Sequence, residues 1–227
     1  MKCLALLFAL FLFCSCKKNE PVACISSMDE KYEEDDKVTF LANCSENGFR
    51  YYWDFGDGNN SEEKNPEHIY NSPGTYVVEL KVYSEKNKSF NSDFRTVTIK
   101  ERPVSVVITS IILSSFPELN WLENSWDVGG LPDVRFQIVD GATIYLDGSE
   151  VAQNADCNLS YTYYSDFPIT LPYSSNYFIN VVDEDGVTDE LVSVINFNPS
   201  SYSMNEESIV VIMDGDCTLI LKLQWVY

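Results

Sequence analysis

Apolar and polar residues alternate along much of this chain with a period of two. Trp53 and Phe55 would lie on one face of a strand, with Tyr52 and Asp54 on the other. Aromatic and aliphatic residues fill every second position of 76–82 in the same way. Short strands are also expected at 38–40 and 97–99 in the first half, and at 104–113, 134–139, 142–146, 159–164, 169–171, 177–182, 191–197, 209–213 and 218–226 in the second. The pattern predicts an all-β protein.

The expected strands fall into two groups, each large enough for one β-sandwich. Pro103 follows the charged run 100–102 and marks the boundary, which gives a first domain at 22–101 and a second at 103–227. Asp-Gly dipeptides begin at positions 140, 147, 185 and 214, and this dipeptide favours hairpin turns. No long segment after the N-terminus has the period of a helix. We therefore expect two β-sandwich domains in tandem.

The N-terminus has the features of an export signal. Lys2 precedes an apolar run at 4–13, which is too short to span a bilayer but suits the core of a secretory signal peptide. Ser15-Cys16 resembles the lipobox of bacterial lipoproteins, in which a small residue precedes the cysteine that is acylated. The resemblance implies a signal peptide at 1–15, a lipid on Cys16 and a tether at 16–21 like those of Bacteroidota-type lipoproteins. Ordinary secretion with cleavage nearby is the alternative.

The remaining cysteines fit an exported protein. Of the 7 cysteines, two lie in the expected signal peptide and Cys16 would carry the lipid. The other four form an even number, as expected for disulfides in an oxidising compartment. The domain boundary favours one disulfide in each domain, Cys24 with Cys44 and Cys157 with Cys217, over the two other pairings. Free thiols are the alternative.

The charge of the chain excludes one class of partner. The formal net charge is -20 at pH 7. Such a chain repels nucleic acid, and it repels anionic lipid unless a cation intervenes. Calcium is the cation that we consider first.

Three short motifs in the first half occur in a fixed order. They are YYWDFGDG at 51–58, NPEHIY at 65–70 and PGTY at 73–76, and the glycines of the first supply the positive φ of a tight turn. Together they resemble the signature of the PKD domain, a small extracellular β-sandwich, over about residues 21–101. The resemblance implies adhesion or surface display rather than catalysis. It also implies that His68, the single histidine, has a structural role.

Two acidic loops in the second half depart from the pattern of simple turns. Asp127 and Asp133 stand six residues apart around a Gly-Gly bend, so the loop can aim both carboxylates at one point. Calcium takes about six to eight oxygen ligands, and crowded carboxylates repel one another without a cation. The second loop follows the strand expected at 177–182 and adds the carboxylates of Asp183, Asp185, Asp189 and Glu190. These six residues are candidate calcium ligands, and ordinary turn aspartates are the alternative.

The spacing of the acidic residues resembles that of a known calcium-binding fold. In the calcium-dependent membrane-targeting domain, first described as the second conserved region of protein kinase C, the first loop has the spacing of Asp127, Gly130 and Asp133. A later loop carries Asp-x-Asp after a strand, as Asp183 and Asp185 do here. The resemblance covers about residues 104–227 and implies a calcium-binding β-sandwich. The chain departs from the family at Val134, where Pro is usual. Its second loop also reaches the last acidic residue after fewer positions than in the family.

Catalytic motifs are absent from the sequence. There is no Gly-x-Ser-x-Gly elbow, no His-Glu-x-x-His pair and no phosphate-binding glycine loop, and one histidine cannot supply several zinc ligands. We therefore expect no enzymatic activity. Trp121 and Trp126 flank the first acidic loop and are candidates for contact with a sugar or a lipid, although such residues more often cover the end of a sandwich.

These observations predict a noncatalytic lipoprotein of the bacterial cell envelope that is anchored by its lipid at the outer membrane. They do not distinguish the periplasmic face of that membrane from the cell surface. Its expected role is adhesion or binding of a glycan or an envelope protein, with a calcium-stabilised second domain. The alternative is a structural spacer or accessory subunit of an envelope assembly without a ligand of its own. A glycan-binding lipoprotein of an uptake system, using Trp121 and Trp126 as a platform, is the third hypothesis.

Overall fold

The computed structural model describes residues 20–26, 31–118, 130–185 and 189–227, and these residues form 16 strands and one short helix. They divide into two compact units. The first contains the residues up to 98 except 31–34, and the second contains 31–34 and 99–227. The division at 98–99 lies close to the boundary that the sequence predicts at 101–103. The all-β prediction is confirmed, since α1 (Ser200–Ser203) is the one helix of the described chain.

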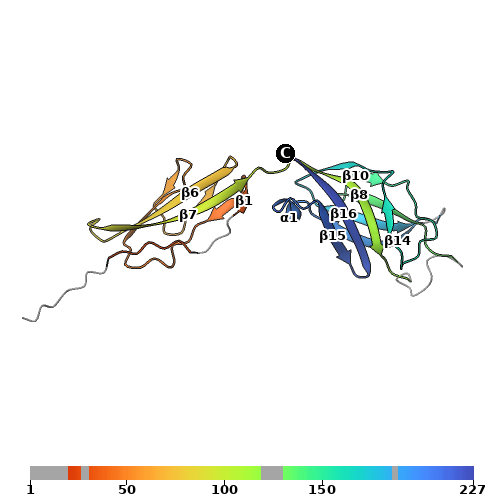
Figure 1. Cartoon of the computed structure of the whole chain (residues 1–227), viewed down its shortest axis with the longest axis horizontal. Coiled ribbons are helices and arrows are strands. Elements are labelled where there is room, and N and C mark those ends of the chain that lie inside the picture. The colour runs from red at the N-terminus through yellow and green to blue at the C-terminus, as the bar shows by residue number, and fades with distance from the viewer. Residues whose placement is uncertain (1–19, 27–30, 119–129, 186–188) are drawn as a thin grey trace, which may run out of the picture. The chain divides into compact units, whose positions relative to one another are not determined.

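Seven strands contribute to the sheets of the first unit. They are β1 (Lys31–Glu33), β2 (Lys37–Thr39), β3 (Arg50–Asp54), β4 (Asn60–Ser61), β5 (Glu67–Ile69), β6 (Gly74–Tyr83) and β7 (Phe90–Lys100). The larger sheet has the order β1-β7-β6-β3-β4, and β2 pairs with β5. Figure 1 labels β1, β6 and β7 of this sheet. β1 and the last residues of β7 are counted with the second unit by their contacts.

The core of the first unit follows from the alternation along β3 and β6. Trp53, Val78, Leu80 and Val82 are fully buried, whereas the intervening residues of β6 keep contact with solvent. Phe40 packs between the rings of Trp53 and Phe55, at centroid distances of 5.4 and 5.2 Å. Burying each large side chain contributes about 1.5 to 3 kcal/mol, so these alternating residues specify which face of the sheet turns inward.

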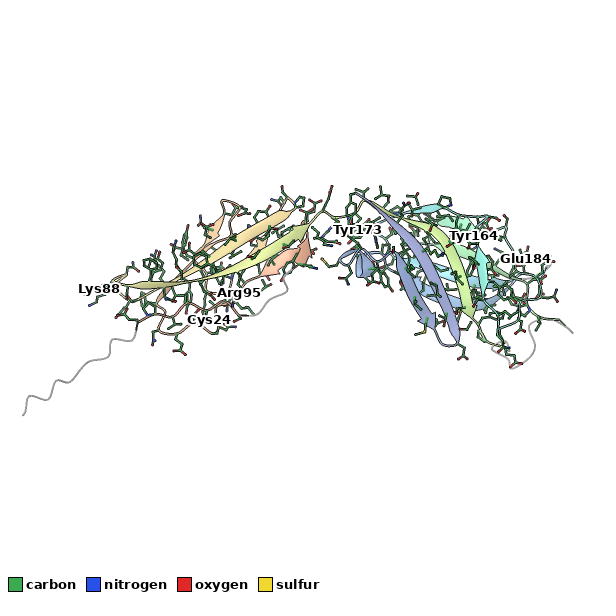
Figure 2. The ribbon with its side chains drawn as sticks, in the orientation of Figure 1. Cys24, Lys88, Arg95, Tyr164, Tyr173 and Glu184 are labelled. Atoms are coloured by element: carbon green, nitrogen blue, oxygen red, sulfur yellow. A yellow bond between two sulfur atoms is a disulfide. The ribbon has the colours of Figure 1, made fainter. Side chains whose placement is uncertain are left out.

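The segment 22–26 is fastened to β7 through side chains. The backbone N–H groups of Ala23 and Ile25 donate to Asn91 Oδ1 at 3.0 Å and Asp93 Oδ2 at 2.8 Å. Arg95 Nη2 also donates to the carbonyl of Ile25 at 3.4 Å, and Figure 2 shows Arg95 close to Cys24. The polar face of β7 thus satisfies backbone groups of a segment that is not itself a strand.

The second unit is a sandwich of two antiparallel sheets. One has the order β10-β9-β13-β14, and the other has the order β11-β8-β16-β15 with β12 also paired to β8. Figure 1 labels β10 and β14 of the first sheet and β8, β16 and β15 of the second. The bounds are β8 (Ser105–Ser115), β9 (Val134–Val139), β10 (Ile144–Asp147), β11 (Tyr161–Tyr163), β12 (Ile169–Pro172), β13 (Tyr177–Asp183), β14 (Glu190–Phe197), β15 (Ile209–Asp214) and β16 (Cys217–Val226). All nine strands expected from the sequence are present, with small differences at their ends.

The inward faces of these two sheets form one core. Ile108, Leu113, Leu219 and Leu221 come from the sheet of β8 and β16, and they pack against residues of the other sheet that are equally buried. Phe136 of β9 meets Tyr163 of β11 edge-on at 4.6 Å, which joins the two layers. The Asp140-Gly141 and Asp214-Gly215 dipeptides lie at the turns between β9 and β10 and between β15 and β16, as expected.

Within the described chain, no helix combines the length and the apolar character that crossing a bilayer would require.

Candidate functional site

The described ends of the two predicted acidic loops, at Asp133 and Asp183, meet at one end of the second unit. Asp183, the last residue of β13, is fully buried and pairs with Val134 of β9. Its Oδ1 accepts a hydrogen bond from the backbone N–H of Asp133 at 2.7 Å, and the neighbouring Glu184 N–H donates to the carbonyl of Asp133 at 2.8 Å. Glu184 is labelled in Figure 2. The sequence therefore brings together two of the six candidate ligands from loops that are 50 residues apart.

The carboxylates at this end also hold the backbone in place. Asp133 Oδ1 accepts a hydrogen bond from the N–H of Asn154 at 2.6 Å. Glu190, at the start of β14, pairs with Asp183 across the sheet. Asp185 is half-buried just beyond β13. Asp133 and Asp183 thus have a structural role that needs no metal, because each accepts a backbone donor from another loop.

Arg135 introduces a positive charge among these acids. Its Nη1 lies 2.8 Å from Asp147 Oδ1 and its Nη2 lies 2.6 Å from Asp189 Oδ2, while its side chain is only 12% exposed. Burial lowers the pKa of Arg135, but the hydrogen bonds that its guanidinium donates to Asp189 and Asp147 outweigh this effect and raise the pKa overall. Asp189, a predicted calcium ligand, therefore already has a cationic partner. Arg135 follows Asp133 by two residues in the sequence, but its pairing with two distant carboxylates depends on the fold.

Calcium binding at this end stays a prediction. Within the parts of the chain that the structure describes, no group of three or more His, Cys, Asp or Glu side chains is placed to hold a metal ion. Asp127, which the prediction requires, lies outside the described residues, as do Trp121, Trp126 and the lipidation residue Cys16. The predicted ligands stay Asp127, Asp133, Asp183, Asp185, Asp189 and Glu190, of which Asp189 already pairs with Arg135.

The cysteines confirm one of the two predicted disulfides. Cys24 and Cys44 are joined, and this bond closes a loop with a sequence separation of 20, for which loop entropy gives a stabilisation of roughly 3 kcal/mol. The predicted bond between Cys157 and Cys217 is wrong, because both are free thiols. Cys217 begins β16 and is buried in the core, whereas Cys157 lies in the loop before β11 and is partly exposed. Counting cysteines within a domain does not provide the geometry that a disulfide needs.

The tight turn after β3 is built around Gly56. Its φ is +81°, and a Cβ at this position would lie 2.6 Å from the carbonyl oxygen of Val77. The carboxylate of Asp54 accepts a hydrogen bond from the N–H of Gly56 at 2.9 Å. The hydroxyl of Tyr70 donates to the carbonyl of Phe55 at 3.0 Å. The motif residues at 54–56 therefore fix the path of the backbone at the end of β3.

His68 is locked into the same structure. Its ring stacks on Phe55, with centroids 4.1 Å apart and planes 5° apart, and meets Tyr70 edge-on at 4.6 Å. His68 Nε2 lies 2.7 Å from Asp57 Oδ2. Burial raises the pKa of Asp57, but hydrogen bonds from Asn59 and then His68 outweigh it, and the pKa is lowered overall. These contacts favour the predicted structural role of His68.

A polar groove with a volume of about 540 Å³ lies beside His68 on the first unit. Lys37 Nζ and Glu67 Oε2 form an ion pair of 3.0 Å across β2 and β5. Asn60 and Asn71 are exposed, and their side chains make no hydrogen bond with other described residues. The lining consists of Lys37, Asn59, Asn60, Glu67, His68, Ile69 and Asn71.

The chemistry of this groove suits a ligand that is rich in hydroxyl groups. An asparagine amide offers two donors and one acceptor, and a hydroxyl group can use both kinds of partner. Lys37 and Glu67 add a charged donor and a charged acceptor beside the amides. Ile69 is the one aliphatic residue of the described lining, so the groove offers little to an apolar ligand. This groove could not be predicted from the sequence, because its lining comes from β2, β4, β5 and the residues beside them, which only the fold brings together.

Comparisons with known proteins bear mainly on the first unit. Residues 18–99 match the family model of the PKD domain. Collagenase ColA of Bacillus cereus is 46% identical over 61 residues, which are 26% of this chain and 6% of the collagenase. The PKD1 domain of Vibrio anguillarum Epp is 31% identical with a TM-score of 0.31, over 37% of this chain and 96% of that structure. The chain spans only a small part of the collagenase. The match to the family model confirms the predicted PKD domain at 18–99.

A further structural neighbour extends over both units. A carbohydrate-binding module of the β-sandwich superfamily is 13% identical with a TM-score of 0.34, over 91% of each chain. Similarity at this level bears on neither the ligand nor the activity of the present chain. The predicted resemblance of the second half to the calcium-dependent membrane-targeting domain stays a prediction.

Proposed function

We propose that this chain is a noncatalytic binding module of the bacterial cell envelope and that its PKD domain holds a glycan in the polar groove beside His68. The observation that carries the proposal is the lining of the groove. Two exposed asparagine amides, of Asn60 and Asn71, lie with the Lys37–Glu67 ion pair around one open volume of about 540 Å³. These groups match the alternating donors and acceptors of sugar hydroxyls.

The surroundings of His68 support binding rather than catalysis. A general base must reach the proton that it removes, and its nitrogen must be available to do so. His68 Nε2 instead lies 2.7 Å from Asp57, and its ring is packed against Phe55 and Tyr70. The groove lining contains no serine or cysteine that His68 could activate as a nucleophile. The histidine thus acts as a rigid wall of the groove.

The proposal places this module on a lipid anchor at the outer membrane. Support comes from the signal sequence and from Ser15-Cys16. An acyl group on Cys16, followed by a short tether, would hold the binding domain close to envelope polysaccharides. Cys16→Ala should move the protein from the detergent phase to the aqueous phase in detergent partitioning. Retention in the detergent phase would show that Cys16 is not the anchor.

Calcium at the acidic end is a separate proposal for the second unit. Asp133 and Asp183 lie side by side there, and Asp127 and Asp185 belong to the same two loops. When bound, the ion would supply positive charge between the loops. Glycan binding in the first unit does not depend on it.

Affinity electrophoresis tests glycan binding. The chain from residue 17 is run through gels that contain soluble glucan, mannan or xylan, and binding is seen as retarded migration. Asn60→Ala with Asn71→Ala removes two hydrogen-bonding groups, each worth about 0.5 to 1.5 kcal/mol, so Kd should rise roughly tenfold. Asn196→Ala, an exposed asparagine of β14, is the matched control and should bind as the unmodified chain does.

Absence of retardation in all gels would overturn glycan binding and favour the structural spacer. Equal retardation of the groove variant and the control would place the binding site elsewhere on the chain. Thermal unfolding of each variant shows whether a loss of binding comes from a loss of fold.

A further inference from the structure

β15 is an open edge of the second unit. It is the last strand of the order β11-β8-β16-β15, so β16 pairs with one of its sides only (Figure 1). Ile209, Val211 and Met213 project from it and are 58%, 56% and 71% exposed, whereas Val210 and Ile212 face the core. Three aliphatic side chains in a row on an edge strand are unusual for the surface of a soluble domain.

The backbone N–H and C=O groups of the same three residues point to the open side of β15, in the plane of the sheet. Leu223 N donates to the carbonyl of Ser208 at 2.8 Å, which makes Ser208 and Leu223 a hydrogen-bonded pair. Hydrogen-bonded pairs recur every second residue in an antiparallel ladder, so the N–H and C=O groups of Ile209, Val211 and Met213 point away from β16. Within the described parts of the chain, no backbone hydrogen bond from another segment satisfies them.

The other edge strands of the described sheets carry features that prevent strand addition. β15 lacks these features. Proteins protect edges with very short strands, bulges, lysines and prolines. β1, β2, β4, β5 and β11 are two or three residues long, and β12 ends in Pro172. β10 and β14 are interrupted by bulges. β15 has six residues, an unbroken register with β16, and neither lysine nor proline.

Charge at the ends of β15 distinguishes between two kinds of occupant. Glu207 precedes the strand, and Asp214 and Asp216 end it. A second copy added antiparallel about Val211 would place Glu207 opposite Gly215 of the second copy, between two aspartates. Like charges would meet at both ends, in a chain of net charge -20. A strand with basic residues at its ends would instead be attracted there.

We propose that β15 receives an extended segment of another protein, in which apolar residues alternate with polar ones between flanking lysines or arginines. The backbone of that segment would pair with Ile209, Val211 and Met213, and its apolar side chains would cover theirs. Addition of a strand to an exposed sheet edge is an established mode of peptide recognition, with affinity from the main chain and selectivity from alternate side chains. This interaction site lies on the second unit and does not rest on glycan binding in the first.

Fluorescence anisotropy with synthetic peptides tests the proposal. The probe is a short fluorescein-labelled peptide of alternating valine and threonine between two pairs of lysines, added to the chain from residue 17. Binding should weaken at least about tenfold when the flanking lysines become glutamates. It should weaken as strongly when alternate amides of the peptide are N-methylated, because those groups can no longer pair with β15. Equal binding of either modified peptide would overturn the proposal.

Two variants locate the binding edge. Val211→Lys places a charge in the middle of β15 at an exposed position and should abolish binding without unfolding the domain. Leu191→Lys, at an exposed position on the bulged strand β14, is the matched control and should bind the peptide normally. Peptide binding that survives Val211→Lys would overturn the assignment to β15. Sedimentation that shows a dimer of the unmodified chain and a monomer of Val211→Lys would identify a second copy as the occupant instead.

Discussion

The carboxylate of Asp183 accepts a hydrogen bond from the backbone N–H of Asp133 at 2.7 Å. This contact joins the last residue of β13 to the residue just before β9. Asp183 has no exposed surface, so its carboxylate serves first to hold the backbone at Asp133 in place.

A calcium ion held by the six candidate carboxylates of the two acidic loops would raise the unfolding temperature of the second unit in calcium relative to chelator. A ligand at about one hundred times its Kd stabilises the folded state by about 2.7 kcal/mol. Asp127→Asn is predicted to abolish the shift. Asp147→Asn changes a carboxylate that pairs with Arg135 and should leave the shift intact. Identical unfolding curves in calcium and in chelator would remove the calcium proposal.

Gly56→Ala is predicted to destabilise the PKD domain more than Gly58→Ala. Both glycines have positive φ, which costs another residue about 1 kcal/mol or more. At Gly56 the new methyl would also meet the carbonyl of Val77, whereas nothing lies within 4 Å at Gly58. We expect losses of about 3 and about 1 kcal/mol in the free energy of unfolding, measured with urea. Equal losses would contradict the close approach of β6 to this turn.

Asp57 should make the free energy of unfolding of the first unit depend on pH in the acidic range. Hydrogen bonds from Asn59 and His68 keep its pKa in the folded protein below the ordinary value of 3.8 despite partial burial. The ionised carboxylate therefore contributes its full stability above about pH 4, and this contribution is lost as the pH falls through the lower folded value. The stability difference between the unmodified chain and Asp57→Asn should shrink as the pH falls below 3.8. A difference that stays constant in this range would show that Asp57 is not stabilised as an anion.

The two free thiols of the described residues, Cys157 and Cys217, should react at very different rates. Burial raises the pKa of the Cys217 thiol to about 11, so it is protonated and enclosed at neutral pH. Cys157 is partly exposed. Iodoacetamide at pH 8 is predicted to modify Cys157 in the folded protein and Cys217 only in denaturant, as mass spectrometry of peptides would show. If both thiols were protected until a reductant was added, the two cysteines would be joined by a disulfide, contrary to this account.

The strands could be predicted because their faces have different environments. Alternation in β6, β9 and β13 follows directly from burial on one face, and the resemblance of residues 51–76 to the PKD signature located the turn at Gly56. The sequence predicted only that the two acidic loops would share a cation, and Asp183 meets Asp133 because β13 pairs with β9. The alternation and the turn, by contrast, depend on local sequence.

Features that depend on register could not be predicted in the same way. Arg135 of β9 reaches both Asp147 and Asp189 only because of the strand order β10-β9-β13-β14. Asp147 ends β10, and Asp189 lies just before β14. The false disulfide had the same cause, since Cys217 is directed into the core by its place in β16. The groove beside His68 likewise needs β5 and the turn before β4 to come together. Pairing of distant strands sets each of these contacts.

An NMR titration of the side-chain amides tests the central claim most directly. The chain from residue 17, labelled with nitrogen-15, is titrated with oligosaccharides from whichever polysaccharide retards it in affinity electrophoresis. Glycan binding in the groove predicts that the side-chain amide signals of Asn59, Asn60 and Asn71 move with a common Kd while that of Asn196 stays fixed. Shifts that leave these three amides unchanged would contradict the groove as the binding site.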